Sequence, residues 1–149
     1  MKITFLGTGA GRPSELRNTS SCFIEFNRLC ILVDAGEATQ HQLLKTNIRP
    51  NRIDVICITH NHGDHIYGLP GLLNTMSIEN RTEPVTIICN ESLKELIKTI
   101  LKVTQSYLAF KIIIKDNTEP IDRLVLRFFW EELIARKFSL QMKTLHVFK

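Results

Sequence analysis

The sequence predicts a layered α/β domain, and three observations favour this fold class. Short apolar runs of strand length alternate with longer segments whose apolar residues recur at helical spacing. One run, Ile53–Thr59, is almost continuously apolar, which is typical of a strand covered on both faces. The 149 residues are 44% hydrophobic and 23% charged, enough for one domain with a core. We therefore assign residues 1–149 to a single domain.

The first part of the chain holds three expected strands and one long loop. Lys2–Leu6 is a short, mostly apolar run that we interpret as the first strand. Gly7–Ser21 is polar and contains glycines and a proline, so it is expected to be a loop. Cys22–Phe26 and Leu29–Asp34 are strand-like and are separated by a turn at residues 27–28. These two segments are expected to pair as a β-hairpin.

Expected helices and strands alternate along the rest of the chain. Asn90 is placed to cap the helix that follows it, because its side chain can accept the free amides of the first turn. Pro70 is tolerated in the first turn of another helix. The expected helices are Gly36–Thr46, Leu69–Ile78 and 91–105. The further expected strands are Pro84–Cys89, Phe110–Lys115, Arg123–Trp130 and Lys137–Phe148.

A cluster of metal-binding residue types follows the buried strand directly. In an extended segment alternate side chains share a side, so His60, His62 and Asp64 are expected to lie together. Gly63 would let the backbone turn tightly and bring His65 to them. Imidazole and carboxylate groups suit zinc, or manganese or iron. Four ligands in six residues fit two pairs on two adjacent metals better than one ion, although a histidine-rich surface loop is the alternative.

Such a metal site predicts hydrolysis. Bound metals lower the pKa of water and neutralise charge on a phosphodiester. Asp64 is a candidate both to bind a metal and to take the proton of the attacking water. Asp34 ends an expected strand, where a carboxylate often orients a metal-binding imidazole. A helix cap is the other interpretation of Asp34.

Three motifs occur in the order of a known family. They are GTGAGRPSELRNTSS (7–21), LVDAGEATQHQLL (32–44) and ITHNHGDHIYGLPGLL (58–73). Together they resemble the N-terminal half of ribonuclease Z, the tRNA 3′-processing endonuclease of the metallo-β-lactamase superfamily. The resemblance implies an αββα metallo-β-lactamase-like sandwich, here incomplete. It also implies a homodimeric phosphodiesterase with two zinc ions per subunit that removes 3′ trailers from precursor tRNA.

The resemblance also implies roles for individual residues. His60 and His62 would bind one zinc, and Asp64 and His65 the other, with Asp64 as proton acceptor. A third ligand of the first zinc would be His146, for which a core position is the alternative. The loop residues that would handle the tRNA 3′ end are Arg12, Pro13, Arg17 and Asn18. Two arginines and an asparagine suit phosphate contacts, and an exposed loop with scattered charges is the plainer interpretation.

The family pattern includes a later bridging aspartate and a final histidine, which these 149 residues do not supply. We therefore expect a half-site, and a sheet that lacks one covering layer and tends to associate. Two alternative functions follow. One is a truncated, inactive family member or an RNA- or partner-binding remnant. The other is a different metallo-β-lactamase-fold hydrolase that acts on small phosphodiesters.

Hydropathy and the N-terminal residues make a cytoplasmic protein the default expectation. The four cysteines, Cys22, Cys30, Cys57 and Cys89, form no CxxC pair and are expected to be buried, reduced thiols rather than zinc ligands. The net charge of +4 arises from residues 81–149, which suits RNA but is also common on solvated surfaces. No window approaches the ~18 apolar residues of a membrane span, and no signal peptide is evident.

Overall fold

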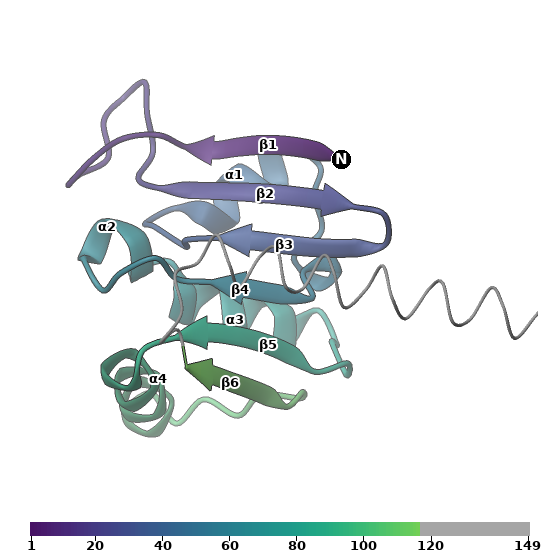
Figure 1. Ribbon diagram of the computed structural model, residues 1–149. Coiled ribbons are helices and arrows are strands. Elements are labelled where there is room, and N and C mark those ends of the chain that lie inside the picture. The colour runs from purple at the N-terminus through teal and green to yellow at the C-terminus, as the bar shows by residue number, and fades with distance from the viewer. Residues whose placement is uncertain (117–149) are drawn as a thin grey trace, which may run out of the picture. The chain divides into compact units, whose positions relative to one another are not determined.

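In the computed structural model, the described residues 1–116 build one six-stranded sheet whose strands lie in chain order (Figure 1). The first three strands are antiparallel, and the third to the sixth are parallel. The strands are β1 (Lys2–Gly7), β2 (Ser21–Phe26), β3 (Leu29–Val33), β4 (Val55–Cys57), β5 (Val85–Cys89) and β6 (Ile112–Asp116). The helices are α1 (Thr39–Lys45), α2 (Gly63–Ile66), α3 (Leu69–Ile78) and α4 (Glu91–Val103), with a 3₁₀ turn η1 (Pro50–Arg52).

The predicted hairpin is present as β2 and β3. Its turn contains Asn27 in the left-handed region at φ 57°, a conformation that asparagine tolerates better than most residues. The parallel strands need long crossovers, which α1, α3 and α4 provide between successive strands. Helices α1 and α3 lie behind the sheet in Figure 1, so these crossovers cover one of its faces.

The core lies between this face of the sheet and the helices. Phe23, Leu32, Ile56 and Ile87 from the strands are fully buried, and Leu43 of α1 is buried with them. Helix α3 contributes four buried side chains at helical spacing, namely Leu69, Leu72, Leu73 and Met76. Full burial of a side chain of this size stabilises the fold by about 1.5–3 kcal/mol. Apolar side chains from the strands and from the helices therefore form one core on this face.

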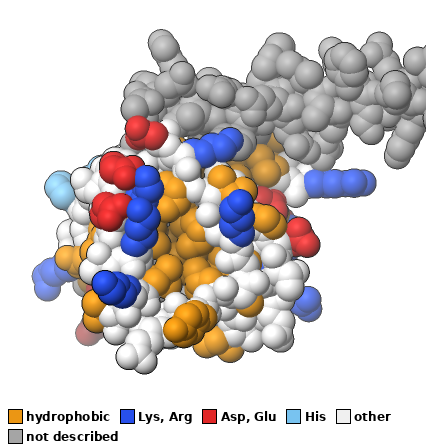
Figure 2. Space-filling view, turned by 90° about the horizontal axis from the view of Figure 1, so that it is seen from below, with side chains coloured by type: hydrophobic (Ala, Val, Ile, Leu, Met, Phe, Trp, Pro, Cys, Tyr) orange, Lys and Arg blue, Asp and Glu red, His pale blue; other side chains and the backbone are white. Residues whose placement is uncertain are grey.

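The other face is also apolar at the edge strand β1. Ile3 and Phe5 of β1 are 46% and 72% exposed. Ile31, Val55 and Ile88 on the same face are buried, so the expected lack of a covering layer is seen only at β1. The tendency to associate stays a prediction. The structure also holds an apolar pocket of about 180 Å³ between the α2–α3 junction and α4. Figure 2 shows hydrophobic side chains gathered on the side where α4 and β6 lie, with Lys and Arg beside them.

Several element boundaries differ from expectation, for local reasons. The helix expected from Gly36 begins only at Thr39, because Ala38 adopts the left-handed conformation at φ 64°. The strand expected over Ile53–Thr59 is reduced to Val55–Cys57. Helix α3 has the predicted bounds. The expected strands Arg123–Trp130 and Lys137–Phe148 lie outside the described residues. Within the described part, no helix combines the length and apolar character needed to cross a membrane.

Asn90 is confirmed as the N-cap of α4, and its side chain joins this helix to the cluster segment. Its Oδ1 accepts the Leu93 amide at 3.0 Å and also Asn61 Nδ2 at 2.8 Å. Asn90→Ala removes both acceptors, so the free energy of unfolding should fall by about 1 kcal/mol or more. Urea denaturation measures this change. Asn90→Asp keeps the acceptor and should stay within a few tenths of a kcal/mol of wild type. An alanine variant as stable as wild type would contradict the assignment.

Candidate metal centre

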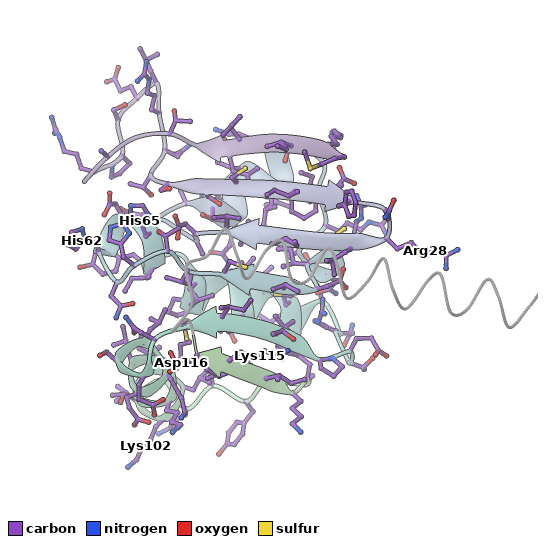
Figure 3. The ribbon with its side chains drawn as sticks, viewed as in Figure 1. Arg28, His62, His65, Lys102, Lys115 and Asp116 are labelled. Atoms are coloured by element: carbon purple, nitrogen blue, oxygen red, sulfur yellow. The ribbon has the colours of Figure 1, made fainter. Side chains whose placement is uncertain are left out.

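The cluster lies at the carboxyl ends of β3 and β4, where parallel strands bring distant residues together. Asp34 follows β3, and its amide donates to the Cys57 carbonyl of β4 at 2.8 Å. The chain then runs from β4 through Thr59 and His60 into α2. Figure 3 shows His62 and His65 at this edge of the sheet, beside α2. Strand pairing therefore determines where the cluster lies.

The extended conformation expected for the whole cluster ends at His62. His62 has extended backbone angles and occupies the N-cap position of α2, whereas Asp64 and His65 are helical. The expectation that alternation places Asp64 beside His60 and His62 is therefore wrong in its mechanism. The helical turn nevertheless keeps the histidines together, because the ring centroids of His60 and His65 are 4.0 Å apart.

The role of Gly63 differs from the one that the sequence suggested. Among the described glycines only Gly11 has a positive φ, so Gly63 does not form a left-handed turn. A Cβ atom at Gly63 would lie 2.2 Å from ring atoms Cε2 and Cζ of Tyr67. The missing side chain thus lets the Tyr67 ring pack over the start of α2.

The donor atoms of the cluster occur in two close pairs. His60 Nε2 lies 3.1 Å from His62 Nδ1, and His65 Nε2 lies 3.6 Å from Asp64 Oδ2. Two ligands of a tetrahedral zinc with bonds of about 2.0–2.1 Å lie about 3.3 Å apart. Both the chemistry and the spacing of each pair therefore fit two ligands of one zinc ion.

The described residues supply these two pairs of metal-ligand candidates and no larger group. Among residues 1–116, no group of three or more His, Cys, Asp or Glu side chains converges so as to hold a metal ion. His146, the predicted third ligand, lies outside the described residues. The cysteines offer no replacement, because all four are free thiols and Cys30, Cys57 and Cys89 are buried. Burial raises the pKa of Cys57 to about 12, which keeps its thiol protonated.

Asp34 is buried and contacts the cluster through His65. Asp34 is 3% exposed, and its Oδ2 lies 2.7 Å from His65 Nδ1. It also accepts the Thr59 amide at 2.8 Å and the Ser20 hydroxyl at 3.3 Å. Helix α1 has Ala38 at its N-cap, so Asp34 caps no helix. Contact with an imidazole is the geometry that the orienting role requires.

The Gly7–Ser21 loop reaches the cluster through its backbone. The Gly11 amide donates to Asp64 Oδ2 at 2.7 Å, a contact that sequence spacing could not reveal. This hydrogen bond, reinforced by the nearby His65 and His62, lowers the pKa of Asp64. The predicted substrate residues adjoin Gly11 in this loop: Arg12, Pro13 and Arg17 are exposed, and Asn18 is half-buried. The Asn18 carbonyl accepts the Gly9 amide at 2.7 Å, which folds the loop on itself.

Three comparisons with known proteins match most of this chain. A family model described as "Anti-Pycsar protein Apyc1" matches residues 1–139. Ribonuclease Z of Limosilactobacillus fermentum is 49% identical over 115 residues, which is 75% of this chain and 37% of that protein. The crystal structure of human tRNase Z, short form, matches with a TM-score of 0.74 and 39% identity, over 78% of this chain and 45% of that chain.

A more distant structure identifies the fold alone. The metallo-β-lactamase fold protein YhfI from Bacillus subtilis matches with a TM-score of 0.62 and 20% identity, over 78% of this chain and 46% of that chain. The fold is therefore the expected metallo-β-lactamase fold. The chain spans less than half the length of the curated relatives that it matches, for example 40% of ribonuclease Z from an Exiguobacterium species.

The Gly11 contact predicts how Asp64 titrates in metal-free protein. Because the Gly11 amide stabilises the ionised carboxylate, the folded-state pKa lies below the ordinary value of 3.8. The contact therefore stabilises the fold above the unfolded-state pKa, and this contribution is lost as pH falls through the lowered folded-state pKa. An NMR titration of the Gly11 amide, with chelator present, should show a midpoint below 3.8 that disappears in Asp64→Asn. A midpoint at or above 3.8 would contradict the contact.

Proposed function

We propose that this chain, which belongs to the family of the Apyc1 model and to the ribonuclease Z branch of the metallo-β-lactamase superfamily, carries the metal-binding part of an endoribonuclease that removes 3′ trailers from precursor tRNA. One observation supports this above the others. The donor pairs His60 with His62 and Asp64 with His65 meet at one edge of the sheet. Sequence identity of 49% to a ribonuclease Z supports the choice of substrate.

The metal assignment follows the two donor pairs. His60 and His62 would hold one zinc, and Asp64 and His65 a second, with manganese or iron accepting the same donors. His146 would complete the first set. When bound, the metals would lower the pKa of a water molecule and neutralise charge on the phosphodiester.

The chain's own groups then have distinct tasks. Asp64, kept ionised by the Gly11 amide, would accept the proton of the attacking water. Asp34 would hold the His65 ring through the 2.7 Å contact to Nδ1. Arg12 directly follows Gly11 in the loop that contacts Asp64, and its guanidinium would bind a phosphate of the RNA. Arg17, Pro13 and Asn18 would shape the same loop.

A cytoplasmic location and a homodimeric state belong to the same proposal. Buried free thiols at Cys30, Cys57 and Cys89 suit a reducing compartment. The homodimer would follow the family pattern, and the exposed apolar residues of β1 and the pocket beside α4 offer surfaces for association.

A cleavage assay with two substrates tests the proposal. Purified protein supplied with zinc or manganese is incubated with a 3′-extended precursor tRNA and, separately, with bis(p-nitrophenyl) phosphate. We expect cleavage on the 3′ side of the tRNA, reduced on the order of 10²-fold or more in Asp64→Asn because the proton acceptor is lost. Asp116→Asn makes the same chemical change at an exposed residue outside the cluster and should leave activity unchanged.

The other outcomes select the alternatives. Cleavage of the small diester without cleavage of tRNA would indicate a hydrolase of small phosphodiesters. Cleavage of neither substrate by folded, metal-loaded protein would indicate an inactive family member or an RNA- or partner-binding remnant. Unchanged tRNA cleavage in Asp64→Asn would rule out the proton-acceptor role.

A further inference from the structure

We propose that Thr59 is a positioning residue that determines which ring nitrogen His60 presents to its metal-binding partner. The inference rests on the metal site proposed above. Thr59 lies between β4 and the cluster, and its hydroxyl oxygen is 3.0 Å from His60 Nδ1. The same oxygen lies 2.9 Å and 3.0 Å from the two carboxylate oxygens of Asp34. One hydroxyl therefore joins the cluster to the buried carboxylate.

The direction of each hydrogen bond follows from counting protons. A hydroxyl donates one proton and accepts through two lone pairs, whereas an ionised carboxylate only accepts. The Thr59 hydroxyl must therefore donate to Asp34. Its oxygen can then only accept from His60, so the proton of the neutral His60 ring lies on Nδ1. The Thr59 amide also donates to Asp34 Oδ1 at 2.8 Å, which fixes the threonine in place.

The tautomer of His65 follows from the same count of protons, with Asp34 as the acceptor. Its Nδ1 lies 2.7 Å from Asp34 Oδ2 and 3.3 Å from the Thr59 oxygen, and both can only accept from it. Both rings therefore carry their proton on Nδ1 and leave Nε2 unprotonated. These are the two nitrogens that face His62 Nδ1 at 3.1 Å and Asp64 Oδ2 at 3.6 Å.

This arrangement has a consequence for metal binding. A metal-binding imidazole needs a free lone pair on the nitrogen that faces the ion, and a hydrogen bond at the other nitrogen fixes that tautomer. The other polar contact of the His60 ring, from Nε2 to His62 Nδ1, can run in either direction, so the Thr59 oxygen is the contact that selects the Nδ1–H form. His65 would keep its tautomer, because its contact to Asp34 does not pass through Thr59.

Two matched variants test the proposal. Thr59→Val keeps the shape of the side chain and removes the hydroxyl, and Thr59→Ser keeps the hydroxyl. Ring ¹⁵N–¹H correlation spectra of metal-free protein, at a pH where the histidines are neutral, report the tautomer of each ring directly. We expect the Nδ1–H form for His60 in wild type and Thr59→Ser, and its loss in Thr59→Val. His65 should keep the Nδ1–H form in all three proteins, and the exposed His41 should not change.

Metal affinity supplies the second readout. Zinc affinity, measured by competition with a chelator, should fall about 10–100-fold in Thr59→Val, as for other losses of a residue that supports a ligand. Thr59→Ser should stay near wild type. The proposal is overturned if wild-type His60 carries its proton on Nε2, a result that the wild-type spectrum alone can give. It is also overturned if Thr59→Val leaves the tautomer of His60 unchanged. Because the tautomer is measured without metal or RNA, failure of the cleavage assay would not affect this result.

Discussion

The contact between Asp34 and the chain that leaves β4 is the constraint on which the site depends. Asp34 adopts the left-handed conformation at φ 59° while 3% exposed, an arrangement that a non-glycine residue keeps only when its surroundings compensate. The compensation is visible in the donors around its carboxylate, from the Thr59 amide and hydroxyl and from His65. Buried polar groups are costly when they lack hydrogen-bond partners, so each of these donors stabilises the position of Asp34.

The backbone next to Asp34 extends this constraint to α2. The Ala35 amide donates to the His65 carbonyl at 2.8 Å, and the Ala35 carbonyl accepts the Gly68 amide at 2.9 Å. A Cβ atom at Gly68 would lie 2.1 Å from the Gly36 carbonyl oxygen, so glycine permits this close approach. The segment after β3 thus holds the C-terminal end of the short helix that carries Asp64 and His65. A helix of four residues has little stability of its own, so these tertiary contacts are needed to keep α2 folded.

Local patterns in the sequence predict the parts of the fold that local physics determines. The turn at residues 27–28 between the hairpin strands, Pro70 in the first turn of α3 and the capping side chain of Asn90 all act over a few residues, and each appears in the structure. The cluster was evident for the same reason, since its donors are neighbours in sequence. The parts that were missed depend on contacts between distant residues. Gly11 meets Asp64 from 53 positions away. Thr59, expected inside a strand, turns its amide to Asp34, 25 positions away.

The central claim is that this edge of the sheet binds metal through two donor pairs. The most direct test is the zinc content of purified, size-fractionated protein, measured by elemental mass spectrometry for wild type, His62→Ala and His41→Ala. Both substitutions remove one imidazole, but His41 lies on the exposed side of α1, away from the cluster. The account predicts bound zinc in wild type and His41→Ala, and its loss or marked reduction in His62→Ala. Folded wild-type protein that binds no zinc, or a His62→Ala variant that retains all of it, would contradict the account.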